Sequence, residues 1–183
     1  DPNGQDLPKI IDHLELGGSV FLSTQKMPAE ELAKLYNVAD CTINISDAEG
    51  FGLSTLESLA CETPIIVTMT GGLQEQVTDK ENNFFGIGIE PTAKAVIGSL
   101  TVPWIHEDRI AKEDFIDALE VMHKMPAPKR AHLGKLGRDH VLEEYNMKKY
   151  VKNWVTALTR VHTENGSWDN RKNYKAWKIK EII

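Results

Sequence analysis

Apolar positions along this chain recur in two alternating patterns. Short apolar runs suit buried strands, and they alternate with longer stretches in which apolar side chains recur every three or four positions, as on one face of a helix. The predicted strands are residues 19–23, 41–45, 64–68 and 84–89, and the predicted helices are residues 7–16, 28–39, 52–61, 73–77, 111–123, 129–145 and 147–161. Such alternation is typical of a parallel sheet with right-handed crossovers. The expected fold class is therefore α/β, a Rossmann-like parallel sheet flanked by helices, with a C-terminal helical extension.

Two segments follow neither pattern. Residues 92–108 follow Pro91 and are interrupted by Gly98 and Pro103, and we interpret them as an irregular surface loop or lid. Residues 164–183 form a basic tail whose aromatic residues are Trp168, Tyr174 and Trp177. The predicted domains are thus an α/β domain at 1–163 and a basic, aromatic tail at 164–183.

The most informative segment follows the predicted strand 41–45. It reads Ser46-Asp47-Ala48-Glu49-Gly50-Phe51-Gly52-Leu53-Ser54-Thr55-Leu56-Glu57. A glycine turn that opens a helix after a strand makes an anion site, because the free amides and the dipole of the first helical turn favour a phosphate. The carboxylates of Glu49 and Glu57 suit neutral hydroxyl groups instead. Phosphate together with hydroxyls describes a nucleotide sugar.

Two further loops are expected on the same edge of the sheet. Gly71 and Gly72 make a second glycine turn after the strand 64–68, and Thr24 and Gln25 follow the strand 19–23. In parallel sheets, ligands bind at the carboxyl ends of the strands. The sequence therefore predicts that three loops converge on one site.

Over residues 35–77 the chain resembles the C-terminal, donor-binding half of a GT-B glycosyltransferase of family 4, the retaining, glycogen-synthase-like group, which carries a Glu-x7-Glu motif. The resemblance implies half of a GT-B fold and an enzyme, a hexosyltransferase, that transfers a hexose with retention from a nucleotide diphosphate sugar to the hydroxyl of a sugar, glycan or glycolipid. Glu49 would contact the donor sugar and is the catalytic candidate, and Glu57 would bind the ribose hydroxyls. The amides assigned to the sugar and diphosphate are those of Gly50, Phe51, Gly52, Leu53 and Ser54. Thr24 and Gln25 would lie near the base.

Each of these residues also has a purely structural interpretation. Glu49 could be a carboxylate that caps a helix N-terminus, and Glu57 could be an ordinary exposed helix residue. We prefer a paired Glu57, because we place it beside apolar Leu56 and Leu59, where a lone carboxylate is costly. Asp47 with Glu49 could be mistaken for a metal-binding pair, but we expect no metal and no cofactor. Thr24 and Gln25 could belong to an ordinary connection.

Several features depart from the family pattern. The family has an N-terminal acceptor domain, and its donor domain begins with strands that carry an Arg and a Lys for the diphosphate. Before Glu49 this chain has no Arg, and its only Lys are Lys9, Lys26 and Lys34. We therefore expect a fragment, or a chain that needs a partner, without full catalysis alone. The alternatives are a non-catalytic nucleotide-binding or assembly module and, with less support, a sugar-nucleotide epimerase or phosphorylase. Glu62 also replaces a family glycine, so either a left-handed cap is strained at this non-glycine residue or the turn differs.

Composition and charge limit the kinds of molecule and compartment that suit this chain. The net charge of −6 argues against nucleic acid as the main partner. No apolar run has the length of a membrane span, and the N-terminus does not resemble a signal peptide, so the expected location is the cytoplasm. The tail could contact anionic lipid headgroups, which would make the protein peripheral to a membrane, or pack on another domain. Exposed apolar edges would favour a homo-oligomer.

Overall fold

The computed structural model describes residues 5–172, in two units. One unit ends at Leu32 and the other begins at Ala33. The first contains helix α1, Leu7–His13, whose N-terminus is capped by the side chain of Asp6. Helix α2, Ala29–Val38, runs across the division. Each unit is described by itself.

The first unit corrects one prediction. Residues 19–23 form no strand, and Phe21 within them is 85% exposed. The amides of Ser19 and Val20 both donate to the carbonyl of Leu16, which closes a turn at the start of the run. Its apolar composition suited a strand, but a strand also needs a neighbour to satisfy its backbone groups, and no described strand pairs with this run.

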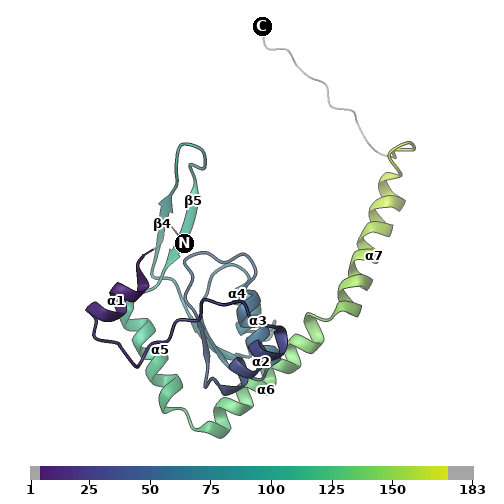
Figure 1. Cartoon of the computed structure of the whole chain (residues 1–183). Helices are drawn as coiled ribbons and strands as arrows, with labels where there is room; N and C mark the ends of the chain where they lie inside the picture. The colour runs from purple at the N-terminus through teal and green to yellow at the C-terminus, as the bar shows by residue number, and fades with distance from the viewer. Residues whose placement is uncertain (1–4, 173–183) are drawn as a thin grey trace. The chain divides into compact units, whose positions relative to one another are not determined.

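The second unit contains the parallel sheet. Strand β1, Thr42–Asn44, and strand β2, Ile65–Thr68, are joined by helix α3, Leu53–Ala60. Strand β3, Gly86–Ile89, follows helix α4, Leu73–Val77. The order is β1-β2-β3 with every neighbour parallel. Figure 1 labels helices α3 and α4, which lie between these strands along the chain. This arrangement confirms the predicted fold class.

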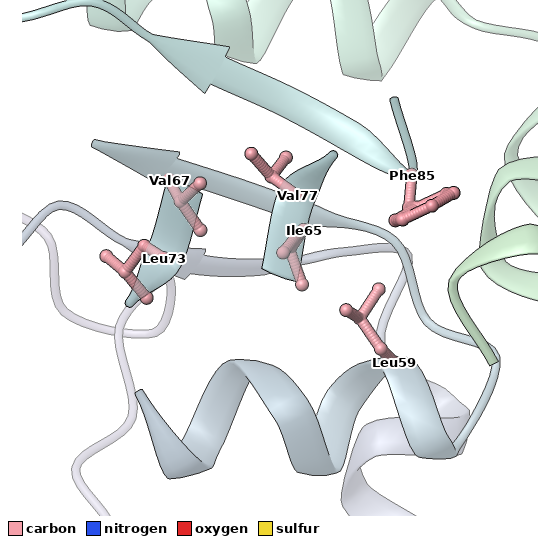
Figure 2. Packing of buried hydrophobic residues seen from close by; sticks show 6 residues of the cluster. All are labelled: Leu59, Ile65, Val67, Leu73, Val77 and Phe85. Carbon is pink, nitrogen blue, oxygen red and sulfur yellow. The ribbon is translucent and has the colours of Figure 1, made fainter. Parts of the chain in front are cut away.

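Alternating side chains of β2 form two cores. Ile65 and Val67 pack on one face with residues of α3 and α4 and with the residue just before β3; the cluster in Figure 2 consists of Leu59, Ile65, Val67, Leu73, Val77 and Phe85. Ile66 faces the other side and packs with Ala118 and Met122 of helix α5, Lys112–Lys124. Helix α6, Ala127–Glu144, lies against the first face, because its Leu136 and Val141 pack on that cluster. Helices therefore cover both faces of the sheet.

The segment predicted as an irregular loop is a β-hairpin. Strand β4, Ala93–Ile97, pairs antiparallel with strand β5, Ile105–Arg109. The prediction was wrong because Gly98 and Pro103 were taken to interrupt the whole segment, whereas they fall in the connection between the strands. Both strands are short and largely exposed, so they lack the apolar run by which the other strands were found.

Two features near the helix ends complete the fold. Glu62 adopts φ 62, so of the two possibilities at this position the structure has the left-handed conformation on a non-glycine residue. Helix α7 runs from Met147 to Asn165 and has no buried residue. No helix among residues 5–172 combines the length and the apolar character needed to cross a membrane. Tyr174, Trp177 and the other tail residues from 173 onward lie outside the described residues.

Candidate functional site

The turn after β1 folds around its own carboxylate. Glu49 Oε1 accepts hydrogen bonds from the amides of Phe51, at 3.3 Å, and Gly52, at 3.2 Å. Just upstream, the side chain of Asn44 accepts from both the amide and the hydroxyl of Ser46. Two of the amides that the sequence assigned to a ligand are thus bound to Glu49 here. A ligand that uses them has to share them with Glu49 or displace its carboxylate.

The second glycine turn packs directly on this first one. Gly71 has φ 49, and a Cβ at this position would lie 1.7 Å from the carbonyl oxygen of Glu49. Only glycine fits there, because the approach leaves no space for a side chain and the backbone is left-handed. The turns that follow β1 and β2 therefore meet at one edge of the sheet, as the sequence predicted for these two loops.

A buried amide ties the two turns together. Gln76 on α4 is fully buried, its Nε2 donates to the carbonyl of Phe51, and its Oε1 accepts from the hydroxyl of Thr55 at 2.6 Å. Thr55, also fully buried, lies in the first turn of α3. The sequence analysis missed Gln76. The available signal was a polar residue on the apolar side of α4, between Leu73 and Val77.

The N-cap residue of α3 is a glycine, which has no side chain to offer to the amides of the first turn. Gly52 precedes the helix with φ 84, and no side chain caps the first turn. Leu53 and Ser54, the first two helical residues, are exposed. Free helical amides and the aligned peptide dipoles give this end a positive potential of about half an elementary charge.

Glu57 lies one or two helical turns further along α3, and its surroundings correct one expectation. The side chain is exposed rather than set in the buried side of the helix, which is formed by Thr55, Ser58 and Leu59. It does have a partner, since the hydroxyl of Tyr36 donates to Glu57 Oε2 at 3.1 Å. Burial, with the hydrogen bond to Glu57, raises the pKa of Tyr36 to about 12. Tyr36 is a second residue that sequence reasoning missed.

The base of the β4–β5 hairpin contacts Asp47, at the start of the turn that contains Glu49. The Arg109 guanidinium lies 2.5 Å from Asp47 Oδ2 and also pairs with Glu107. The amide of Asp108 donates to the carbonyl of Asp47 at 2.7 Å, and the hydroxyl of Thr70 donates to Asp108 at 2.8 Å. The hairpin therefore brings a cation to the turn, which the sequence analysis did not foresee because it treated this segment as irregular.

Thr24 and Gln25 lie in the other unit, in a stretch without helix or strand. Their assignment to the base of a nucleotide stays a prediction. No three His, Cys, Asp or Glu side chains within residues 5–172 are grouped so that they could hold a metal ion.

Comparison with known proteins identifies the family. A family model described as glycosyl transferases group 1 matches residues 2–103, more than half of the 183 residues. The chain belongs to this family of glycosyltransferases. The resemblance seen in the sequence is therefore confirmed.

Individual relatives agree with the family. The chain is 38% identical over 85 residues to a D-inositol 3-phosphate glycosyltransferase of Acidothermus cellulolyticus, covering 46% of this chain and 19% of the relative. It is 42% identical over 95 residues to a protein of that name from Streptosporangium roseum, covering 49% and 22%. The chain thus spans about a fifth of the length of these relatives.

A solved structure supports the fold. The sucrose-phosphate synthase of Thermosynechococcus elongatus matches 89% of this glycosyltransferase chain with a TM-score of 0.65 and 23% identity, and 37% of that structure is covered. The likeness shows a shared GT-B-type α/β fold.

Proposed function

We propose that this glycosyltransferase chain is the donor-binding part of a larger enzyme, which transfers a hexose with retention from a nucleotide diphosphate sugar to an acceptor hydroxyl. The observation that carries the proposal is the junction of the two glycine turns, where the Glu49 carboxylate accepts from the amide of Gly52, the N-cap of α3. Membership in the glycosyltransferase family supports it.

Each part of this edge has a role in the proposal. The open end of α3 receives the diphosphate, whose negative charge grows as the sugar leaves, and a fixed dipole stabilises that charge without reorganisation. The sugar hydroxyls replace the amides of Phe51 and Gly52 as partners of Glu49. Glu57 accepts hydrogen bonds from the ribose, and Tyr36 holds its carboxylate in place through the contact at 3.1 Å.

Calorimetric titration with UDP, GDP and ADP, and with their glucose and mannose conjugates, tests the proposal. We expect saturable binding of one nucleotide series. Glu57→Ala should weaken it at least about tenfold, because the ribose loses a charged acceptor worth roughly 1.5–3 kcal/mol. Glu62→Ala is the matched control, since it removes another exposed carboxylate just beyond the end of the same helix, and it should leave binding unchanged.

A non-catalytic module derived from such a domain is the second candidate, and one observation favours it. Arg109 is the cation beside the Asp47 turn, and two carboxylates already engage it, so it is not free to neutralise a diphosphate. Absence of binding at millimolar nucleotide would contradict the donor site and favour the module.

A further inference from the structure

The base of the β4–β5 hairpin contacts both glycine turns through a single residue. The amide of Asp108 donates to the carbonyl of Asp47, in the turn that follows β1, at 2.7 Å. The carboxylate of Asp108 accepts from the hydroxyl of Thr70, in the turn that follows β2, at 2.8 Å. Thr70 is 5% exposed and the side chain of Asp108 is 20% exposed. Water therefore competes little for this hydrogen bond, which the charge of the acceptor also strengthens.

The strands of the hairpin keep Asp108 in this place. Asp108 lies opposite Lys94 in the antiparallel register, and Lys94 Nζ is 3.6 Å from Asp108 Oδ1. Successive side chains of a strand point to opposite faces, so Asp108 and Arg109 leave β5 in opposite directions. On one face Arg109 pairs with Asp47. On the other face Asp108 meets Thr70. Each face of the base thus contacts a different turn.

Thr70 affects the position of Glu49 through the close packing of the two turns. Gly71 follows Thr70 directly, and a Cβ on Gly71 would lie 1.7 Å from the carbonyl oxygen of Glu49. A Cβ on Gly72 would likewise lie 2.7 Å from the carbonyl oxygen of Phe51. Backbones packed this closely leave no free space into which one turn could move alone. A shift of Thr70 would therefore move the backbone that carries the Glu49 carboxylate.

The carboxylate of Glu57 is held by a different contact. It accepts from the hydroxyl of Tyr36, on α2, at 3.1 Å, whereas the contacts of Asp108 described above reach the turn of Glu49. In the proposed donor site, Glu49 binds the sugar and Glu57 binds the ribose. Asp108 and Tyr36 should therefore influence different parts of the donor.

We propose that Asp108 is a positioning residue for the donor sugar. By holding Thr70, it keeps Gly71 packed on the backbone of Glu49. It thereby sets the place at which the carboxylate of Glu49 meets the sugar hydroxyls, without binding the donor itself. This role rests on the proposed donor site, and it gives the hairpin a share in the recognition of the sugar.

Replacement of Asp108 by alanine tests this role with two ligands that differ only in the sugar. The Asp108→Ala variant is titrated calorimetrically with the nucleotide diphosphate that binds, among UDP, GDP and ADP, and with its glucose or mannose conjugate. Affinity for the conjugate should fall about tenfold relative to affinity for the nucleotide diphosphate, because Glu49 is displaced from the sugar hydroxyls. Asp108→Asn keeps an oxygen that can accept from Thr70, and it should restore the ratio of the two affinities to within about twofold.

Four further variants separate positioning from stability. Thr70→Val removes the donor of the same hydrogen bond and should lower the affinity ratio as much as Asp108→Ala does. The double variant should show no additional loss, because both changes remove one contact. Lys94→Ala is the matched control, since it removes only an ion pair in which Lys94 is 75% exposed, and it should leave the ratio unchanged. Tyr36→Phe should weaken both ligands by the same factor.

Amide hydrogen exchange, followed by NMR, reports on the turn without any ligand. Gly52 is buried, and its amide donates to Glu49 at 3.2 Å. Exchange of this amide should become about tenfold faster in Asp108→Ala, because the Glu49 turn is no longer held. The amide of Val67, a fully buried residue of β2, is the internal control and should exchange at the rate of the unaltered chain.

Opposing results are distinguishable. Equal losses of affinity for the two ligands would mean that Asp108 only stabilises the fold, and unchanged exchange at Gly52 would mean that it does not hold the turn. Either result overturns the proposal and leaves the donor site standing if nucleotide still binds. An unaltered chain that binds no nucleotide refutes the donor site and the sugar role together, even if faster exchange at Gly52 shows that Asp108 holds the turn.

Discussion

Replacing the buried Gln76 by Leu tests whether the two glycine turns are joined through its amide. Leu has nearly the same volume, so the change removes two hydrogen bonds without opening a cavity. The matched control is Gln74→Leu, two residues away on α4, where the side chain is exposed and donates to the carbonyl of Gly71 at 3.3 Å.

The cost of Gln76→Leu follows from the groups that it leaves unpaired. The carbonyl of Phe51 loses the donor that Gln76 supplies, which costs about 1–3 kcal/mol. The hydroxyl of Thr55 keeps a partner, because it also lies 2.8 Å from the carbonyl of Gly52, and it adds little. We therefore expect the free energy of unfolding to fall by about 2 kcal/mol. For a chain of this length that lowers the midpoint of thermal unfolding by about 4–8 °C.

Urea unfolding followed by far-ultraviolet circular dichroism measures this difference, because the helices give the signal. Gln74→Leu should stay within about 0.5 kcal/mol of the unaltered chain, as surface substitutions usually do. Calorimetric titration of the Gln76→Leu variant with the nucleotide series that binds then measures the effect on affinity. A displaced Phe51 backbone should weaken nucleotide binding about tenfold. Equal stability of the Gln76 and Gln74 variants would refute the reasoning, because it would mean that the buried amide contributes no more than an exposed one.

Three other expectations rest on single residues. Gly71→Ala should lower the free energy of unfolding in urea by about 3 kcal/mol or more, since a Cβ has no space there and φ is positive. Gly50→Ala, where a Cβ meets nothing within 4 Å, should lower it by less than about 1 kcal/mol. Equal losses of stability in the two variants would contradict the packing of Gly71 on the Glu49 turn. Glu62→Gly relieves a left-handed φ of 62 and should raise the thermal midpoint by about 2–4 °C in calorimetry; a lower midpoint would contradict the strain. The pKa of Tyr36 is raised to about 12 from a usual value of 10.0, so the folded state holds this proton more tightly than the unfolded state does. The resulting stabilisation is fully present below pH 10 and is lost as the pH rises from 10 to 12. After allowance for solvent screening, Tyr36→Phe should remove about 1 kcal/mol of this pH dependence, and superimposable pH profiles of the two chains would exclude the contact.

The regular core of this chain could be predicted because its signals are local. Helix α4 was predicted with the bounds that the structure has, Leu73–Val77, and strands β2 and β3 were found from continuous apolar runs. Glu62 was identified from one position where glycine is expected, since left-handed backbone depends on the residue itself.

Features that depend on distant partners could not be predicted in this way. The role of Gln76 exists only once the turn of Phe51 packs on α4, and the sequence of α4 alone presents it as one more polar residue. The run at residues 19–23 has the composition of a strand and no strand neighbour among the described residues. The assignments of Glu49, Glu57, Thr24 and Gln25 to a nucleotide sugar remain predictions that binding measurements have to test.

The tie between Asp47 and Arg109 also has a consequence for the order in which this protein takes shape during synthesis. The two residues are 62 positions apart, so the ribosome delivers the turn of Glu49 long before it delivers the hairpin that anchors it. At a synthesis rate of about 5–20 residues per second, about 3–12 s pass between the synthesis of Asp47 and that of Arg109. The family match ends at residue 103, before Arg109. A chain cut at that boundary would therefore keep the motif and lose the whole of β5, Ile105–Arg109, including the arginine that holds the turn.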